Sequence, residues 1–307
     1  MGAAARSDIA LGATVNLNGD PSSLVPAFSA SVGGNTPALW SISSKWGQDS
    51  TKHFPTQKAE DLHAMGVTPL IWWTPTNPAD WEAGRYERYQ RILNGKHDKY
   101  IKNWAKAAAD FGHLVVVRFA HEANGNWFPW SISRFDNSAR NFKQAWRYVR
   151  NMVRDQGATN VKFLWSVAKQ SCRGCNPYMR VFPGRTNVDY VGFTAFNWGT
   201  FGNNSWQSLV RTYQQPMNKL AFTKKPVIAA ETASHYKGGD KAKWIRLGYK
   251  KAYAKWPRLK AIVYLDSNPK NTWFRHPNWE LSMPKDGSAL AAYAAIAGKP
   301  EFQGSLP

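Results

Sequence analysis

KYIKNWAKAAADFGHLVVVRFAHE, residues 99–122, contains the unit that decides the fold. Its first part, residues 99–112, is amphipathic and stops at a glycine, as helix C-termini often do. A short β-branched run, LVVVRFAHE, follows at residues 114–122 and is typical of a buried strand. The stretch therefore predicts a helix that leads directly into a strand ending in Glu122.

The same alternation of strand and helix patterns runs along the whole chain. Eight runs are candidates for strands, at residues 9–17, 38–44, 67–75, 114–122, 161–167, 188–196, 226–232 and 259–267. Amphipathic segments lie between them, such as residues 56–66, 99–112, 139–157, 206–221, 241–256 and 288–298. Eight strand–helix repeats in about this length predict an α/β fold, the (β/α)₈ TIM barrel. Since no break in composition marks a second domain, residues 9–307 are expected to form one domain after a flexible tail, residues 1–8.

Composition excludes some classes of protein. With 307 residues, 43% of them hydrophobic, the chain can bury a large core. Its apolar patches, such as residues 288–298, fall well short of the roughly 18 residues that span a bilayer. The net charge of +20 allows an anionic partner, but the basic residues are spread through helix-like segments without a zinc-finger, RNP or bZIP pattern. Neither a nucleic acid nor a membrane is therefore expected as a partner.

The two cysteines, Cys172 and Cys175, lie close together in CRGC. Two thiols cannot supply the four ligands of a structural zinc site, and the helix pattern of a thioredoxin-like motif does not follow them. Either a tight loop disulfide or two idle thiols is expected.

Two candidate strands lead into glutamates, and a barrel makes that position informative because active groups gather at the C-terminal ends of its strands. Glu122 closes the run at 114–122, and Glu231 closes VIAAE in the run at 226–232. Side chains alternate across a strand, so Glu122 is expected to share a face with Arg118, and Glu231 with Ala229. If both faces point inward, both carboxylates meet at the barrel mouth.

A pair of carboxylates across a sugar bond is what glycoside hydrolysis requires, because one protonates the leaving oxygen while the other attacks or activates water. Trp127, Phe128 and Trp130 follow Glu122 and offer an apolar setting that would hold it protonated as the acid. Arg118 would keep Glu231 ionised as the nucleophile. Sixteen Trp residues fit this interpretation, since flat aromatic faces stack on sugars, although most of them are expected in the core.

Three other interpretations are open. Arg118 and Glu122 could form an ion pair that lines an inert barrel. The aromatic residues could grip a polysaccharide without turnover. A metal hydrolase is a third possibility because His121 adjoins Glu122, but HEANG lacks the second His of a zincin helix, so no metal and no cofactor are expected. His235, just past Glu231, is interpreted as a local polar contact or a subsite residue and not as a metal ligand.

Three segments carry ordered motifs, RFAHEANGNWFPW at residues 118–130, VFPGRTNVDYVGFTAFNWG at 181–199 and PVIAAET at 226–232. Together they resemble glycoside hydrolase family 26, the β-mannanase family. RFAHEANGNWFPW (118–130) is similar to the family's acid/base segment. VFPGRTNVDYVGFTAFNWG (181–199) resembles the stretch that runs through the sixth strand into Asn-Trp-Gly, and PVIAAET (226–232) resembles the strand with the nucleophile. The resemblance covers residues 110–235 well and the rest loosely, and it implies a (β/α)₈ barrel.

The resemblance also implies roles for individual residues. Glu122 would be the general acid/base and Glu231 the nucleophile of a retaining double displacement. Arg118 and His121 would orient and hydrogen-bond the reacting sugar, which for His121 presumes a bulge or turn in the strand. The remaining residues expected to line the sugar subsites are Trp73, Trp127, Trp130, Phe196, Asn197, Trp198, Tyr264 and Asp266.

The sequence departs from the family pattern around the subsites. Phe196 stands where the family usually has a Tyr whose hydroxyl contacts the nucleophile. WWTPTN (72–77) replaces a Trp-Glu-Pro motif on the third strand, and VYLDSN (263–268) replaces a Trp at the end of the eighth. Tyr264 could supply the missing hydroxyl. These changes put the substrate, more than the chemistry, in doubt.

The sequence therefore predicts an endo-acting β-1,4-mannanase on mannan or glucomannan. The alternatives are the same chemistry on mixed-linkage β-glucan, β-1,3-xylan or an acidic polysaccharide, and a non-catalytic binding barrel. The N-terminus, MGAAARSDIALG, is not a secretory signal, but it could replace a removed leader, and a polysaccharide substrate favours a secreted protein. A monomer is expected.

Overall fold

The computed structural model describes residues 8–46, 54–75, 89–170, 174–268 and 277–307. Most of the predicted tail, Cys172, and Thr76 and Asn77 of the third-strand motif lie outside these residues. The chain comprises two compact units, unit 1 (Met1–Ser41 with Thr194–Pro307) and unit 2 (Ile42–Phe193). Each unit is described by itself below.

All eight predicted strands are confirmed, and they follow one another in chain order around a closed barrel. Their bounds are β1 Ala10–Thr14, β2 Leu39–Lys45, β3 Thr68–Thr74, β4 Val115–Phe119, β5 Val161–Ala168, β6 Tyr190–Asn197, β7 Val227–Ser234 and β8 Leu259–Leu265. The (β/α)₈ fold class predicted from the sequence is therefore confirmed.

The predicted helices are also present. The α-helices are α1 Pro21–Ser31, α2 Thr56–Ala64, α4 Tyr89–Leu93, α5 Asp98–Phe111, α6 Ala139–Asp155, α7 Leu209–Lys219, α8 Lys241–Lys255 and α9 Ser288–Ala297. Side-chain caps begin several of them, as when Ser138 accepts a hydrogen bond from the Asn141 amide at the start of α6. Gly112, at φ 74°, ends α5 and turns the chain into β4. Sequence patterns did not predict α1 or α4.

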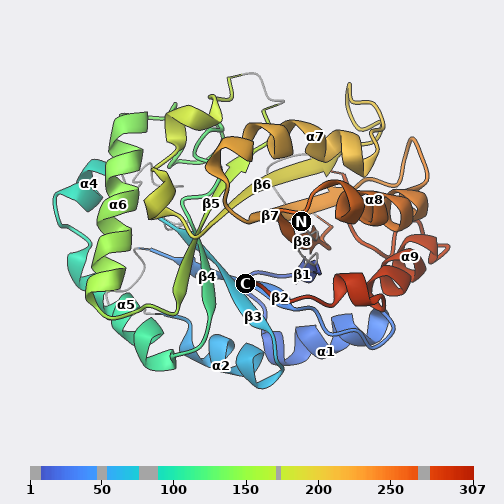
Figure 1. Cartoon of the computed structure of the whole chain (residues 1–307), viewed down its shortest axis with the longest axis horizontal. Helices are drawn as coiled ribbons and strands as arrows, with labels where there is room; N and C mark the ends of the chain where they lie inside the picture. The colour runs from blue at the N-terminus through green and yellow to red at the C-terminus, as the bar shows by residue number, and fades with distance from the viewer. Residues whose placement is uncertain (1–7, 47–53, 76–88, 171–173, 269–276) are drawn as a thin grey trace, which may run out of the picture. The chain divides into compact units, whose positions relative to one another are not determined.

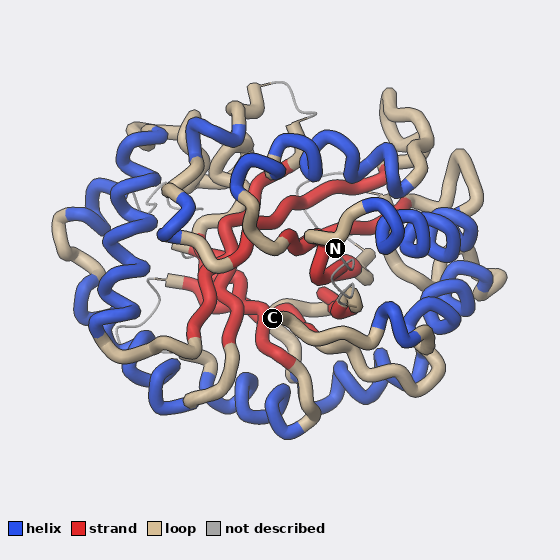
Figure 2. Tube along the Cα trace, in the orientation of Figure 1, coloured by secondary structure: helices blue, strands red, loops and turns tan. Residues whose placement is uncertain are grey.

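In unit 2, β4 lies between β3 and β5, and its five residues are all buried (Figure 1). Helices α5 and α6 lie outside these strands, as Figure 2 shows in blue against red. Alternation along β3 separates two adjacent tryptophans, because Trp72 is in register with Arg118 and Trp73 with Phe119. Trp73 faces the helices: it stacks on Trp104 at 4.2 Å between ring centroids and donates a hydrogen bond to the Tyr100 hydroxyl.

In unit 1, β8 pairs in parallel with both β1 and β7 (Figure 1). The β7–β8 register shifts between Ala229 and Thr232, so β7 carries one extra residue where Glu231 lies. Helices α8 and α9 pack side by side outside these strands. None of the helices in the described part of the chain combines the length and the hydrophobicity that a membrane span requires. Cys175, in unit 2, is disulfide-bonded.

Trp73→Ala should lower the free energy of unfolding by about 3–5 kcal/mol, because it removes a fully buried indole from a packed aromatic cluster. Urea unfolding followed by circular dichroism measures the change. Met179→Ala, at a side chain that is 59% exposed in the same unit, is the control and should cost less than about 0.5 kcal/mol. A cost below about 1.5 kcal/mol for Trp73→Ala would contradict this assignment to the core.

Candidate active site

The chain leaves the barrel abruptly at the end of β4. The strand ends at Phe119, and the next residues turn, with positive φ at Ala120 (41°) and Glu122 (55°). The turn stays bonded to both neighbouring strands, because the Ala120 amide donates to Trp73 O at 3.1 Å and the Glu122 amide to Ser166 O at 2.9 Å. The prediction that Glu122 lies on the strand, sharing a face with Arg118 by alternation, is therefore wrong. A turn brings Glu122 back over the strand end.

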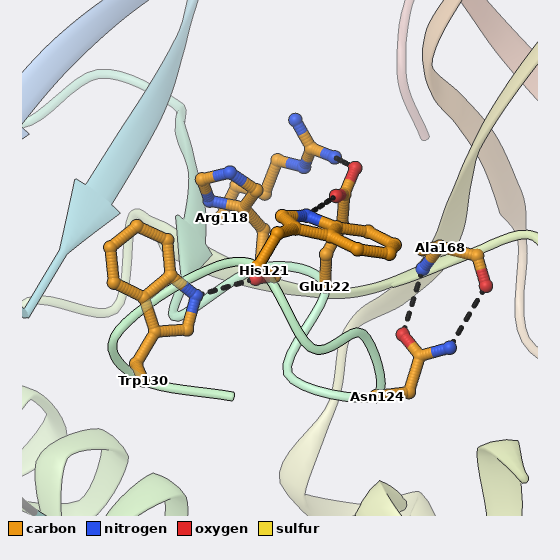
Figure 3. Close-up of polar contacts among 7 residues, drawn as sticks. Arg118, His121, Glu122, Asn124, Trp130 and Ala168 are labelled. Carbon is orange, nitrogen blue, oxygen red and sulfur yellow. Dashed lines mark hydrogen bonds and ion pairs between the residues drawn. The ribbon is translucent and has the colours of Figure 1, made fainter. Parts of the chain in front are cut away.

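Glu122 is 6% exposed, and two of the described side chains contact its carboxylate (Figure 3). Trp127 Nε1 donates to Oε2 at 2.9 Å, and Arg118 Nη2 lies 3.5 Å from Oε1. Arg118 is fully buried, with its guanidinium 4.7 Å from the centre of the Trp72 ring. The ion pair required by the inert-barrel alternative is thus present, but a second donor, the partly exposed Trp127, acts on the same carboxylate.

His121 lies in an aromatic cage beside this carboxylate. Its ring centroid is 4.9 Å from that of Trp72, 4.8 Å from Phe128 and 5.3 Å from Trp130. Burial, and then the charge of Arg118, lower the pKa of His121 well below its ordinary value. His121 is therefore neutral at neutral pH, and among the described residues nothing hydrogen-bonds its Nδ1.

Two residues that the sequence did not single out shape the turn. The fully buried Asn124 side chain bonds both backbone groups of Ala168 at the end of β5, donating at 2.9 Å and accepting at 2.8 Å (Figure 3). Gly125 leaves room for Trp127, since a Cβ there would lie 2.7 Å from the indole ring. The Asn-Gly pair in the sequence is the signal that marks them both.

Two tryptophans expected to line subsites are structural instead. Trp73 is fully buried against α5, so Trp72 is the tryptophan of β3 that reaches Arg118 and His121. Trp130 is buried, stacks on Phe128 and donates from Nε1 to His121 O at 2.6 Å, which holds the His121 backbone (Figure 3). Within residues 118–130, the large aromatic residues that are partly exposed to solvent are Trp127 and Phe128.

In unit 1, Glu231 lies on β7 and is 9% exposed. It does not close the strand as predicted, because β7 continues to Ser234. The Thr232 hydroxyl donates to Ala195 O at 2.8 Å and ties this part of β7 to β6. The register shift beside β8 also breaks the simple alternation that placed Ala229 and Glu231 on one face.

Asn197 ends β6 and organises the neighbouring loops. Its amide nitrogen donates to Ser234 Oγ at 2.8 Å, and its side-chain oxygen accepts from the amides of Gly199 and Gln207. His235 also bonds here, because its amide donates to Asn197 O and its Nδ1 accepts from the Lys237 amide at 2.9 Å. The side-chain bond fits the local polar contact, which is one of the two roles expected for His235. Asn197 is 1% exposed, so its function is to hold these loops, not to line a subsite.

Phe196 and Trp198 flank Asn197, and both are partly exposed. Trp279, from the chain after β8, packs against both, with ring centroids 4.8 Å from Phe196 in a stacked geometry and 5.4 Å from Trp198 edge-on. We call Phe196, Trp198 and Trp279 the aromatic wall. Sequence reasoning missed Trp279 because it looked for a tryptophan inside β8, whereas this residue follows the strand by 14 positions and bonds back to Ser267.

Tyr264 and Asp266, which were expected to line subsites near the end of β8, form hydrogen bonds within the protein instead. Tyr264 is fully buried and its hydroxyl donates to Trp279 O at 2.9 Å, so that proton is not available to replace the missing tyrosine of the family pattern. Asp266 accepts from the Leu281 amide at 2.7 Å, and burial raises its pKa. Among the described residues, no group of three or more His, Cys, Asp or Glu could hold a metal ion.

The buried neutral His121 generates a prediction about stability. In the unfolded chain the residue takes up a proton as pH falls through about 6.5, whereas in the folded chain its lowered pKa prevents this. Neutral His121 therefore does not reduce the free energy of unfolding above about pH 6.5. Below that pH the free energy of unfolding falls, by up to about 1.4 kcal/mol per pH unit. His121→Phe should flatten this slope between pH 7.5 and 5.5 in urea titrations. The exposed His63→Gln should keep it, and equal slopes for His121→Phe and wild type would contradict the assignment.

Comparison with known proteins identifies relatives for most of the chain. The chain is 32% identical over 244 residues to endoglucanase H of Acetivibrio thermocellus, a match that covers 78% of this chain and 25% of that protein. It is 26% identical over 134 residues to the beta-1,3-xylanase TXYA of a Vibrio species, covering 42% of this chain and 27% of the other. The chain thus spans about a quarter of the length of these relatives.

Solved structures agree on the fold. The catalytic domain of the GH26 endo-beta-1,4-mannanase from Bacillus sp. JAMB-750 superposes with a TM-score of 0.68 at 16% identity, covering 96% of this chain and 88% of that one. The family model for glycosyl hydrolase family 26 matches residues 65–233, more than half of the chain, from β3 through Glu231. The chain belongs to glycosyl hydrolase family 26.

Proposed function

We propose that this chain is a retaining glycoside hydrolase in which Glu122 is the general acid/base and Glu231 the nucleophile. The observation that carries the proposal is the Glu122 carboxylate, buried just past β4 and bound by Trp127 and Arg118. A second buried carboxylate, Glu231, lies on β7 in a family 26 chain. Active groups of (β/α)₈ enzymes come from the C-terminal ends of several strands, which supports pairing the two.

The reaction needs two steps. In the first, a Glu231 oxygen attacks the anomeric carbon while the bond to the leaving oxygen breaks and Glu122 gives that oxygen its proton. In the second, Glu122 takes a proton from water, whose oxygen displaces Glu231 from the same carbon and restores both carboxyl groups. Retention of configuration requires the two carboxyl groups to stand about 5 to 5.5 Å apart.

The surrounding residues prepare Glu122 for both steps. Trp127 can only donate its N–H, so its bond to Oε2 sets the rotation of the carboxyl group. Arg118 is held over Trp72, and we propose that its charge also serves to keep Glu231 ionised. His121 is neutral and held beside the carboxylate, so it can hydrogen-bond a sugar hydroxyl without adding a charge.

The proposed substrate is a β-linked polysaccharide cleaved within the chain. β-1,4-Mannan is the first candidate, because the ordered motifs on the fourth, sixth and seventh strands are those of the β-mannanase family. β-Glucan is the second, because endoglucanase H is the relative with 32% identity over 78% of the chain. Trp127 and Phe128 in unit 2, with Phe196 and Trp198 in unit 1, are the partly exposed aromatic residues proposed to stack on sugar rings.

A polysaccharide substrate supports a secreted protein, since such polymers lie outside the cell. The disulfide at Cys175 supports the same proposal, because disulfides persist mainly in oxidising compartments.

A panel assay tests the substrate. Purified protein is incubated with β-mannan, mixed-linkage β-glucan, β-1,3-xylan and a uronate-bearing polysaccharide, and products are sized by chromatography. Mannan oligosaccharides of several lengths are the expected result, and release of glucose oligomers alone would transfer the proposal to β-glucan. A preference for uronates that falls with salt would instead favour an acidic substrate, which a net charge of +20 allows.

Glu122→Gln and Glu231→Gln should each lower kcat by about a thousandfold, because each removes one proton-transfer or nucleophilic group. Initial rates of reducing-end release measure this. The exposed Glu60→Gln in unit 2 and Glu301→Gln in unit 1 are matched controls and should keep wild-type rates. Binding without turnover in the wild type, or equal product release from wild type and both site variants, would leave only the binding-barrel alternative.

Azide distinguishes the two glutamates on an activated aryl glycoside. With Glu122→Ala, azide should attack the glycosyl intermediate on Glu231 and give a glycosyl azide of retained configuration. With Glu231→Ala, it should attack the substrate directly and give the inverted anomer. Proton NMR reads the anomers, and the reverse assignment would exchange the two roles.

Gly125→Ala should lower kcat by about tenfold or more, because the added Cβ displaces the Trp127 ring that holds Glu122. Trp127→Phe should lower kcat to a similar extent, since it keeps a ring but removes the N–H. Gly66→Ala is the control in the same unit, because nothing lies within 4 Å of its added Cβ, and it should lose stability only, from its positive φ. Wild-type kcat in both Gly125→Ala and Trp127→Phe would show that this bond has no part in the reaction.

A further inference from the structure

Lys241 is placed where a lysine is normally avoided. It is the first residue of α8, where the helix dipole disfavours a cation, and its side chain is 2% exposed. The other side chains of this helix that carry positive charge, such as Lys243, Arg246 and Lys250, point into solvent. A buried ammonium needs partners that compensate for lost hydration, so its contacts indicate what it holds.

Those contacts lie in the chain after β8. Lys241 Nζ donates to Trp279 O at 3.1 Å and to Glu280 O at 2.5 Å. The Tyr264 hydroxyl donates to the same Trp279 oxygen, and the Nζ atom lies 5.8 Å from the centre of the Tyr264 ring. One carbonyl is therefore bound by two buried donors, which fixes the backbone of Trp279 from behind.

Further bonds fasten the same short segment on its other side. The Trp279 amide donates to Ser267 O at 2.9 Å, and the Leu281 amide donates to Asp266 Oδ1 at 2.7 Å. Residues 278–281 are thus clamped between the start of α8 and the end of β8. The Trp279 ring projects from this clamp onto Phe196 and Trp198.

We propose that Lys241 is a positioning residue that sets the aromatic wall against which a sugar ring of the polysaccharide packs beside Glu231. β7 carries Glu231 and lies between β6 and β8. β6 contains Phe196 and leads into Trp198, and β8 precedes Trp279. Lys241 acts through Trp279 and touches no substrate. The inference rests on the proposed function for its ligand, but the clamp itself is a property of the free protein.

The charge of Lys241 gives the clamp a pH dependence. Burial lowers the pKa of Lys241 to about 7, and the negative charges of Asp266 and Glu280 limit this shift because they favour the ammonium. The ammonium is therefore present at pH 6 and lost by pH 8.5, which removes the charge from its bonds to the two carbonyls. His235, Lys237, Asp240 and Tyr264 are further titratable groups on the packed elements, so the pH effect is measured against variants of Lys241 itself.

Lys241→Met, which keeps the apolar stem, should raise KM for the best polysaccharide by about tenfold at pH 6 and change kcat by less than threefold. Lys241→Arg keeps a permanent charge and should retain a low KM at both pH 6 and pH 8.5. Wild-type KM should rise between these pH values, and that of Lys241→Met should stay high at both. The exposed Lys243→Met, two residues along the same helix, should follow the wild type.

Hydrogen exchange of the free protein separates this proposal from the proposed function. Peptides covering residues 277–283 should exchange about tenfold faster in Lys241→Met than in Lys243→Met, because the Trp279 and Leu281 amides lose their clamp. If the wild type hydrolyses no polysaccharide, the proposed function fails, and this exchange still decides the clamp. For Lys241→Met, unchanged hydrogen exchange together with the wild-type dependence of KM on pH would overturn the inference. If Lys241→Met does not fold, a KM that depends on pH in Lys241→Arg would overturn it.

Discussion

The turn after β4 is the constraint on which the candidate site depends. Two non-glycine residues, Ala120 and Glu122, adopt positive φ there, at a cost of roughly 1–2 kcal/mol each. Backbone bonds to Trp73 and Ser166 hold the turn, and Asn124 fastens it to the end of β5. Backbone strain held by the surrounding structure is typical of functional sites. Here the turn places the Glu122 carboxylate beyond the strand end, where Trp127 donates a hydrogen bond to it.

The structure divides the many aromatic residues by task. Trp73, Trp104 and Trp46 form a core behind β3, where packing stabilises the fold. Trp72 and Trp130 are an inner layer that holds Arg118 and His121 through ring contacts and one hydrogen bond. A partly exposed set, which includes Trp127 and Trp198, remains for a ligand. A high tryptophan content therefore reflects packing and support of the candidate site as well as the partly exposed rings.

In unit 1, different contacts fix the backbone around Glu231 and the neighbouring aromatic residues. Glu231 lies on a strand that carries an extra residue, and Asn197 ties the following loops together with four hydrogen bonds. The segment after β8 supplies Trp279, and a buried lysine holds it through backbone carbonyls. In unit 2 buried polar groups fix the backbone near the partly exposed Trp127, and in unit 1 they fix the buried Trp279, which packs against the partly exposed Phe196 and Trp198. A backbone fixed in this way limits the entropy lost when a ligand binds.

The sequence by itself determined the eight strands, most of the helices and the (β/α)₈ class, because these depend on local hydrophobic periodicity. Its short ordered motifs also predicted Glu122 and Glu231 as the catalytic pair, which stays a prediction. Only the tertiary structure decided which of Trp72 and Trp73 faces the site, since adjacent residues of a strand differ only in the face they occupy. The tertiary structure also decided that Glu122 lies in a turn beyond its strand. It places the side chains of Asn197 and Tyr264 in internal hydrogen bonds, and it brings Lys241 into contact with the Trp279 carbonyl. These features depend on contacts between residues far apart in the chain, which no local pattern records.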